Sequence, residues 1–246
     1  YESLRVAFDR KLRHALVAIA QDDGVAVVIL TGAGNSFCAG MDLKAIGAAR
    51  APGEPDPLLV AVDAFEVLEH LPQPVIAAIN GPAITGGLEL ALACDILLAA
   101  QGAVLGDTHA RVGVIPGGGN TQRLPRILGP SRAKELLFAS DYMPAEEALR
   151  WGLVSRVVPA EALMDVARAL ARQIAANHPP TVRLMKSLIN RGLRMDFGSG
   201  LALERAEFLR LLLGRQPSTV EVRRQMVVDT GRRRVRELKT KPGEEQ

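Results

Sequence analysis

The feature that most constrains this chain is a strand-like run that turns through glycines into a helix-like run. The apolar segment Val75–Ile79 enters the turn at Gly81, and Gly86-Gly87 lead into a second apolar segment, Leu88–Ala93. The first N–H groups of a helix have no partner within the helix, and glycine lets a ligand approach the backbone. Glu89 falls in the first turn, beside those donors. N–H donors and a carboxylate at one point are what acyl chemistry through an enolate requires.

Taken alone, this pattern favours a simpler interpretation. Gly86-Gly87 would form only a tight turn, and Glu89 would complement the helix dipole. A second glycine-bounded loop, Gly34–Asp42, follows another apolar run, Val25–Thr31. Two turns of this kind supply two converging N–H groups, so the second loop favours the functional interpretation.

Three segments, taken together and in this order, resemble the enoyl-CoA hydratase/isomerase (crotonase) family. They are residues 36–44 (SFCAGMDLK), 74–91 (PVIAAINGPAITGGLELA) and 113–124 (GVIPGGGNTQRL). Each motif is weak by itself, but the combination is highly specific. The similarity extends over roughly residues 2–190.

The resemblance implies an α/β fold with two regions. Residues 1–190 would form a crotonase-like core, a spiral of ββα units, and residues 191–246 a C-terminal helical oligomerisation region with a basic tail. We expect the apolar stretch Leu201–Leu213 to build a homotrimer or a homohexamer, although an intramolecular cap stays open. Family members usually begin with two strands, and these are missing before the first predicted helix. The basic stretch Arg232–Lys241 is interpreted as a solvated tail, with an arm over coenzyme A phosphates or a nucleic-acid contact as alternatives.

Hydrophobic periodicity and chain breakers predict the elements independently of the resemblance. The predicted helices cover residues 1–21, 42–49, 58–71, 88–93, 130–140, 144–152, 160–177, 180–192 and 197–213. The predicted strands cover residues 25–31, 75–80, 95–100, 103–105 and 154–158, with the first two buried. Arg50–Pro57 would be a mobile surface connection. Strands that alternate with helices indicate an α/β domain.

In this family, two backbone N–H groups form an oxyanion hole for the thioester carbonyl. By motif position these groups belong to Met41 and Gly86, and losing one such donor typically costs ~3 kcal/mol. The Met41 side chain would line the acyl pocket. The same motifs imply further substrate contacts, which fall on Ala39, Gly40, Asp42, Lys44, Gly87, Pro116 and Gly117.

Hydratases of this family carry two catalytic glutamates, and this chain matches one of them. Glu89 occupies the first position, whereas the second position, four residues before Gly113, is occupied by His109. Hydration needs one group to take a proton from water and another to deliver a proton to the α-carbon. We predict that Glu89 is the principal acid/base group and takes the first role, and that His109 modulates or assists in the second, because imidazole titrates near neutrality. Asp107 is a lesser candidate, and a loop histidine that only forms hydrogen bonds is the structural alternative.

We therefore predict an enoyl-CoA hydratase that adds water to a 2-enoyl-CoA. A single glutamate also suits double-bond isomerisation, and decarboxylation or thioester hydrolysis occurs on the same scaffold. A dinucleotide-binding dehydrogenase fits poorly, because Gly32-Ala33-Gly34 lacks a third glycine at the required offset. An RNA-binding oligomer would suit the basic C-terminus but lacks aromatic stacking platforms. Ser36 and His109 do not match a serine-peptidase motif.

Composition adds bounds on partners and compartment. A net charge of +3 suits an anionic ligand but is too small to argue for nucleic acid. The two cysteines, Cys38 and Cys94, form no disulfide framework, which predicts a reducing cytoplasm. No apolar run reaches the ~18 residues of a membrane span, and no Cys/His cluster has metal-site spacing. We expect no cofactor beyond the coenzyme A of the substrate.

Overall fold

The computed structural model describes residues 6–42, 44, 53, 57–214, 224, 227–233 and 235–236. The chain divides into two compact units, residues 1–187 and 188–246. The predicted helix at 42–49 and the predicted connection at 50–57 lie almost entirely outside the described residues. Every helix in the described ranges is too short or too polar to cross a lipid bilayer.

A four-stranded parallel sheet forms the centre of the first unit. Its strands are β1 (Val28–Thr31), β2 (Val75–Ile79), β4 (Ile96–Ala100) and β7 (Arg156–Val158), in the order β1-β2-β4-β7. All five residues of β2 are buried, as its continuous apolar sequence predicts for a central parallel strand. The prediction of a buried strand at 25–31 is wrong in part, since β1 begins at residue 28 and is only partly buried. The reason is its position at the edge of the sheet, where the described strands pair with it on one side only.

A second sheet of three short strands accompanies the first. It contains β3 (Ala83–Ile84), β5 (Val104–Gly106) and β6 (Tyr142–Pro144), with β3 parallel and β6 antiparallel to β5. The chain alternates between the sheets: β2 is followed by β3 and then by helix α4 (Gly86–Leu92), and β4 by β5 and then by α5 (His109–Val112). This succession is the predicted series of ββα units. Strands β3 and β6 and helix α5 were not predicted, because an element of two to four residues carries almost no periodicity unless an apolar run marks it, as one does for β5.

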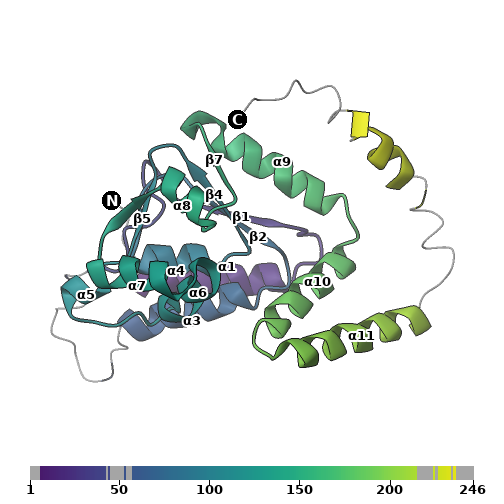
Figure 1. Cartoon of the computed structure of the whole chain (residues 1–246), viewed down its shortest axis with the longest axis horizontal. Helices are drawn as coiled ribbons and strands as arrows, with labels where there is room; N and C mark the ends of the chain where they lie inside the picture. The colour runs from purple at the N-terminus through teal and green to yellow at the C-terminus, as the bar shows by residue number, and fades with distance from the viewer. Residues whose placement is uncertain are drawn as a thin grey trace. The chain divides into compact units, whose positions relative to one another are not determined.

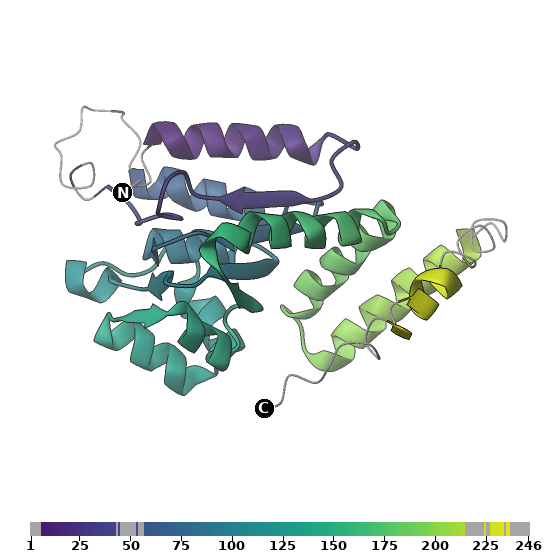
Figure 2. The ribbon, with the colours of Figure 1, turned by 90° about the horizontal axis from the view of Figure 1, so that it is seen from above.

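Helices cover the sheets on more than one side (Figure 1). Helix α1 (Val6–Ala20) packs against α3 (Pro57–Glu69), and Figure 2 shows the two running side by side. Helix α9 (Leu163–Ala175), preceded by a 3-10 turn at Ala160–Ala162, packs across β1, β2 and β4. The remaining helices of the unit are α6 (Asn120–Leu128), α7 (Pro130–Ala139), α8 (Ala145–Trp151) and α10 (Pro179–Gly192), the last of which extends past residue 187. Between the layers lies the core, in which the fully buried side chains include Leu68, Ile76, Leu88, Leu98 and Leu105.

Most predicted helices agree with the observed ones to within a few residues. Helix α6 was not foreseen, because Pro125 lies inside it and proline removes an interior helix hydrogen bond. The helix nevertheless forms and begins at the glycine-rich segment that faces Glu89. This placement connects α6 to the candidate site.

The second unit is dominated by α11 (Phe197–Gly214). Asp196 precedes the helix and accepts hydrogen bonds from the Ser199 backbone N–H (3.0 Å) and hydroxyl (2.6 Å). These bonds lower the pKa of Asp196. Large apolar side chains of α11 are exposed in the single chain; they are Phe197, Leu201, Phe208, Leu209, Leu211, Leu212 and Leu213.

Candidate active site

Glu89 lies in the first turn of α4, as the sequence predicts, and its side chain is buried. The Oε1 atom accepts hydrogen bonds from the backbone N–H of Gly118 (2.7 Å) and, more weakly, of Asn120 (3.4 Å). A Cβ at residue 118 would collide with the Phe65 ring and lie 2.9 Å from the Glu89 carboxyl carbon. Glycine is therefore required for the loop to close over this carboxylate.

The environment of Glu89 favours its protonated form. Burial raises the pKa of Glu89 above its ordinary value of 4.5 and outweighs the lowering effects of His109 and of the two backbone donors. Removing a carboxylate from water disfavours its charged form, so a buried glutamate holds a proton more strongly than an exposed one. A carboxylate with a raised pKa is a stronger base when it is ionised, which suits proton transfer near neutral pH.

His109 is the first residue of α5, so it belongs to a helix start and not to an irregular loop. Its Nδ1 atom lies 2.9 and 3.0 Å from the two carboxylate oxygens of Asp107. Its Nε2 atom lies 3.9 Å from Oε2 of Glu89. One ring nitrogen is therefore held by Asp107, and the other faces Glu89. The structure brings together the two residues that the sequence analysis assigned to proton transfer.

Asp107 is fully buried, yet its carboxylate has donors on every side. It accepts hydrogen bonds from the His109 backbone N–H (3.0 Å) and from Nδ2 of Asn120 (2.6 Å), in addition to the contact with the ring. Burial acts to raise the pKa of Asp107, but the hydrogen bonds from His109 and Asn120 outweigh it, and the pKa is lowered. Asp107 therefore favours the ionised form, unlike Glu89.

Sequence reasoning missed Asn120. Its backbone N–H donates to Glu89 and its side chain donates to Asp107, so one residue contacts both carboxylates. The available signal was its place directly after three glycines, at the start of a helix, where backbone donors are free. Nothing in the local pattern indicated which side chain its amide would reach.

The two glycine-bounded loops meet beside α4. Cys38 forms an isolated bridge with Ala83, and the Cys38 carbonyl accepts a hydrogen bond from the Ile84 N–H at 2.9 Å. Gly40 has a φ of +91°, and a Cβ there would lie 2.8 Å from the Ile84 carbonyl oxygen and 3.5 Å from the Gly86 nitrogen. Residues 40 and 86 are therefore in contact distance. Met41, the other predicted oxyanion donor, directly follows Gly40 and is partly buried against the core.

The residues that cap α4 and α5 are hydrogen-bonded to each other. Thr85 Oγ1 lies 2.7 Å from Thr108 Oγ1 and accepts a hydrogen bond from the Thr108 N–H at 3.1 Å. Thr85 has a φ of 56° and a ψ of −110°, which is unusual for a residue with a branched Cβ. Strained backbone of this kind often marks a functional site. This contact fixes the start of α4 relative to the start of α5.

The predicted substrate-contact residues occupy two segments. Gly87 is buried, and a Cβ on it would collide with the Cys38 carbonyl. Asp42 accepts a hydrogen bond from the Lys44 N–H at 3.0 Å, and residue 44 is exposed. The other members of the set are Ala39 and Pro116, which are half-buried, Gly40, which is buried, and Gly117, which is exposed.

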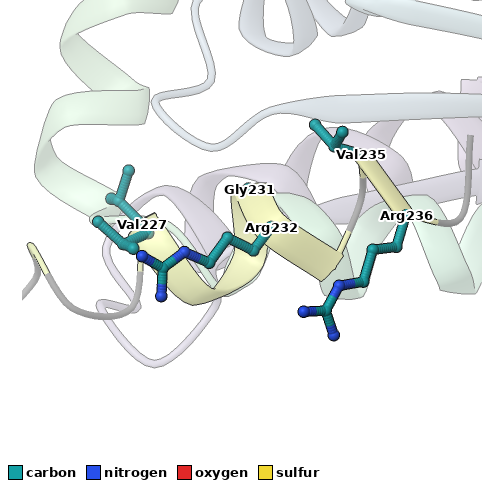
Figure 3. Close-up of a pocket in the computed structure, with 6 residues that line it drawn as sticks. Val227, Gly231, Arg232, Val235 and Arg236 are labelled. Atoms are coloured by element: carbon teal, nitrogen blue, oxygen red, sulfur yellow. The ribbon is translucent and has the colours of Figure 1, made fainter.

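A shallow hollow in the second unit does not resemble the Glu89 site. It has a volume of about 510 Å³ and lies along the helical residues 227–233, as Figure 3 shows. Its lining consists of Val227, Val228, Gly231, Arg232, Val235 and Arg236. These six residues include no carboxylate and no imidazole, so the hollow offers no acid–base pair. In the described parts of the chain, no cluster of three His, Cys, Asp or Glu side chains could hold a metal ion.

Comparison with known proteins identifies the family. The family model described as enoyl-CoA hydratase/isomerase matches residues 2–213. YngF of Bacillus subtilis, whose name places it among the enoyl-CoA hydratases/isomerases, is 44% identical over 204 residues, which cover 81% of this chain and 77% of the relative. The short-chain-enoyl-CoA hydratase of Clostridium acetobutylicum is 40% identical over 200 residues, or 81% of this chain and 77% of that protein.

Solved structures give the same result. The crystal structure of an enoyl-CoA hydratase from Bacillus anthracis superposes with a TM-score of 0.85 at 40% identity, covering 93% of this chain and 88% of the other. The shared fold and the extent of identity leave one assignment. This chain belongs to the enoyl-CoA hydratase/isomerase family and is an enzyme of that family.

Proposed function

We propose that this protein is an enoyl-CoA hydratase that adds water across the double bond of a 2-enoyl-CoA thioester. One observation carries the proposal: Glu89 and His109 face each other at 3.9 Å in a buried site, and each is held from its other side by hydrogen bonds. Hydration needs two proton-transfer groups close enough to act on one water and one carbon. An isomerase needs only one such group to move a proton between carbons.

The proposed reaction begins with the thioester carbonyl against the N–H groups of Met41 and Gly86. Glu89 removes a proton from water as the water oxygen bonds to C3, and the double-bond electrons move onto the carbonyl oxygen, where the two donors stabilise the enolate. Nε2 of His109 then gives its proton to C2, and the carbonyl re-forms. Glu89 is left protonated and His109 neutral, so the proton passes back between them across 3.9 Å before the next turnover.

Electrostatics support these roles. The raised pKa of Glu89, which burial causes, makes its carboxylate a competent base for water. The ionised Asp107 lies against the His109 ring and compensates a positive charge on it. The charged pair before the reaction and the neutral pair after it hold the same number of protons and differ only in which group carries the shared one.

The remaining assignments also stay proposals. We propose that Ala39, Gly40, Asp42, Lys44, Gly87, Pro116 and Gly117 contact the substrate, and that no cofactor is needed beyond its coenzyme A. Both cysteines are buried as thiols, and a cytoplasmic location remains a prediction. We assign residues 1–190 to the catalytic core and residues 191–246 to oligomerisation.

The test of activity is product analysis with a panel of 2-enoyl, 3-enoyl and 3-hydroxyacyl thioesters. We expect the 2-enoyl and 3-hydroxyacyl thioesters to interconvert. Conversion of 3-enoyl to 2-enoyl thioesters without hydration would identify an isomerase that uses Glu89 alone, and would contradict the proposed role of His109. Calorimetric titration with coenzyme A and a short acyl-CoA tests binding separately from turnover.

We further propose a homotrimer or a dimer of trimers assembled through α11. The support is the apolar surface of that helix, on which Leu213 is 89% and Phe208 60% exposed in the single chain. Exposed apolar surface on this scale marks an interface more often than a solvent-facing side. Light scattering at micromolar concentration checks the mass, and a monomer would contradict the assembly.

A further inference from the structure

The geometry points to Asp107 as the positioning residue of this site. Its carboxylate fixes the His109 ring and keeps a proton on Nδ1, so that Nε2 is the only ring atom that exchanges protons. The inference deepens the proposed function and rests on it for the identity of the substrate. The state of the ring itself is measurable without any substrate.

The first argument is the orientation of the ring. Both oxygens of Asp107 lie within 3.0 Å of Nδ1 of His109. Turning the ring by half a revolution would place a carbon against the carboxylate and another carbon towards Glu89. That orientation loses the contact with Asp107 and leaves a buried carboxylate with fewer donors. Asp107 therefore selects the orientation in which Nε2 faces Glu89.

The second argument is the position of the proton. An ionised carboxylate only accepts hydrogen bonds, so the ring nitrogen that it contacts must be the donor. The other donors around Asp107 support ionisation: the His109 backbone N–H meets Oδ1, and the Asn120 amide meets Oδ2. They also hold the pKa of Asp107 down against the opposing effect of burial. The neutral ring thus carries its proton on Nδ1 and a lone pair on Nε2.

Asp107 is itself held in place by burial and by its hydrogen bonds. It is fully buried, and α5, α6 and the end of β5 enclose it through the contacts with His109 and Asn120. The charged or titratable groups that face the ring are Asp107 and, from α4, Glu89. A second group that orients the base or acid is a common arrangement in proton-transfer sites, where it sets tautomer and ring position.

The substitution Asp107→Asn tests this arrangement with little change in shape. In the variant, an N–H₂ group replaces one of the two carboxylate oxygens. One oxygen accepts a hydrogen bond from the His109 backbone N–H, and the other accepts one from the Asn120 amide. The new N–H₂ group needs an acceptor, and Nδ1, which lies next to both oxygen positions, becomes one when its proton moves to Nε2. We expect the neutral ring to switch tautomer in this variant.

The measurement is long-range ¹H–¹⁵N correlation of the histidine rings in the full chain, at a pH high enough for the rings to be neutral. The chain has four histidines, and His109 is assigned by the loss of its signals in His109→Ala. We expect the Nδ1–H form in the parent and the Nε2–H form in Asp107→Asn. An Nε2–H form in the parent would overturn the inference, whether or not any variant folds.

Kinetics provide the second readout. Asp107→Asn should lower kcat for hydration about tenfold or more, up to the ~10²–10⁴ that a positioned proton-transfer group supplies, and leave KM nearly unchanged. In the His109→Ala background the same change should have no further effect on kcat, because Asp107 acts through His109. Additive effects of the two substitutions would contradict the inference.

Asp95 offers a matched control. Its carboxylate also accepts a hydrogen bond from a backbone N–H, that of Val75 (2.7 Å), and contacts a basic side chain, that of Lys186 (2.7 Å). It directly precedes β4 and contacts the first residue of β2, at the opposite end of that strand from the turn into α4. Asp95→Asn should change neither the His109 tautomer nor kcat. An equal loss of kcat in both variants would mean that Asp107 is only structural.

The outcomes separate this inference from the proposed function. A parent enzyme with the Nδ1–H form but no hydration of any 2-enoyl thioester would refute the proposed reaction and leave the role of Asp107 standing. Hydration by a parent enzyme with the Nε2–H form would support the proposed reaction and refute the role of Asp107.

Discussion

Two successive ββα units build the site. Each places a proton-transfer group at the start of a helix, but the hydrogen-bond donors around the two groups differ. In the first, β2 and β3 lead through Thr85 into α4; in the second, β4 and β5 lead through Thr108 into α5. The units lie side by side, since β2 pairs in parallel with β4 and β3 with β5. Each helix presents one candidate proton-transfer group in its first turn, Glu89 or His109.

The difference lies in what surrounds each carboxylate. The donors to Glu89 are backbone N–H groups, one of them at 3.4 Å, and burial dominates, so its pKa is raised. Asp107, beside His109, has side-chain donors at 2.6–3.0 Å, and its pKa is lowered. Two buried carboxylates in one site therefore have opposite preferences for the proton. The comparison teaches that the number and strength of donors, more than burial alone, decide whether a buried acid is charged.

The largest expected effect comes from the first ββα unit, which carries Glu89. Glu89→Gln keeps the shape and the hydrogen bond from Gly118 but removes the base, so hydration should slow by ~10² or more while acyl-CoA binding stays nearly intact. Steady-state rates with a 2-enoyl thioester and calorimetry on the same preparation measure the two quantities. A variant as fast as the parent would place the catalyst elsewhere.

Substitution in the second ββα unit, which carries His109, should have a smaller and reaction-dependent effect. His109→Ala should slow hydration by roughly tenfold or more but slow isomerisation less, because only hydration needs a second group near the water. His109→Glu restores the residue that the resemblance implies and should exceed His109→Ala in hydration. The ratio of hydration to isomerisation in the three proteins is the measurement. An unchanged ratio would argue that both units act in both reactions.

The smallest effects concern stability, and they should have opposite signs. The folded pKa of Glu89 lies above the ordinary 4.5, so its contribution is most favourable below that pH and is lost as pH rises through the folded pKa. Glu89→Gln should therefore raise Tm relative to the parent near neutral pH, and the gain should shrink as pH falls to 4.5.

Asp107 should behave in the reverse manner. Its folded pKa lies below the ordinary 3.8, so its stabilising contribution is present above that pH and is lost as pH falls through the folded pKa. Asp107→Asn should lower stability near neutral pH by about 1–3 kcal/mol, the usual cost of leaving a buried donor unpaired. The deficit should shrink in acid. Melting curves of the parent and of both variants between pH 3 and 7 test the two predictions. If the difference in Tm from the parent changes with pH in the same direction for both variants, the contrast between Glu89 and Asp107 is refuted.

Local sequence chemistry made the first ββα unit predictable. A continuous apolar run predicted β2, and glycines before an apolar segment predicted α4 with Glu89 in its first turn. Strands β4 and β5 followed from the same reasoning. The position of His109 came from its spacing to Gly113, and the structure places its ring beside Glu89.

Other features had no local signal. The exposure of β1 depends on its edge position, which is a property of the whole sheet. Strands β3 and β6 are too short for periodicity, and their pairing with β5 forms only when distant segments meet. Helix α6 forms in spite of Pro125, which local propensity counts against a helix.

The strand–glycine–helix turns that carry residues 89, 107 and 109 follow from local sequence, because turn geometry and helix starts depend on neighbours in the chain. The groups that these side chains contact depend on tertiary structure. The contact of Glu89 with Gly118 spans 29 residues, and that of Asp107 with Asn120 spans 13. Such contacts depend on the register of β2 with β4 and of β3 with β5, and on the closure of a glycine loop over α4. The protonation preferences of Glu89 and Asp107 follow from those contacts and from burial, which arise only when the core has packed.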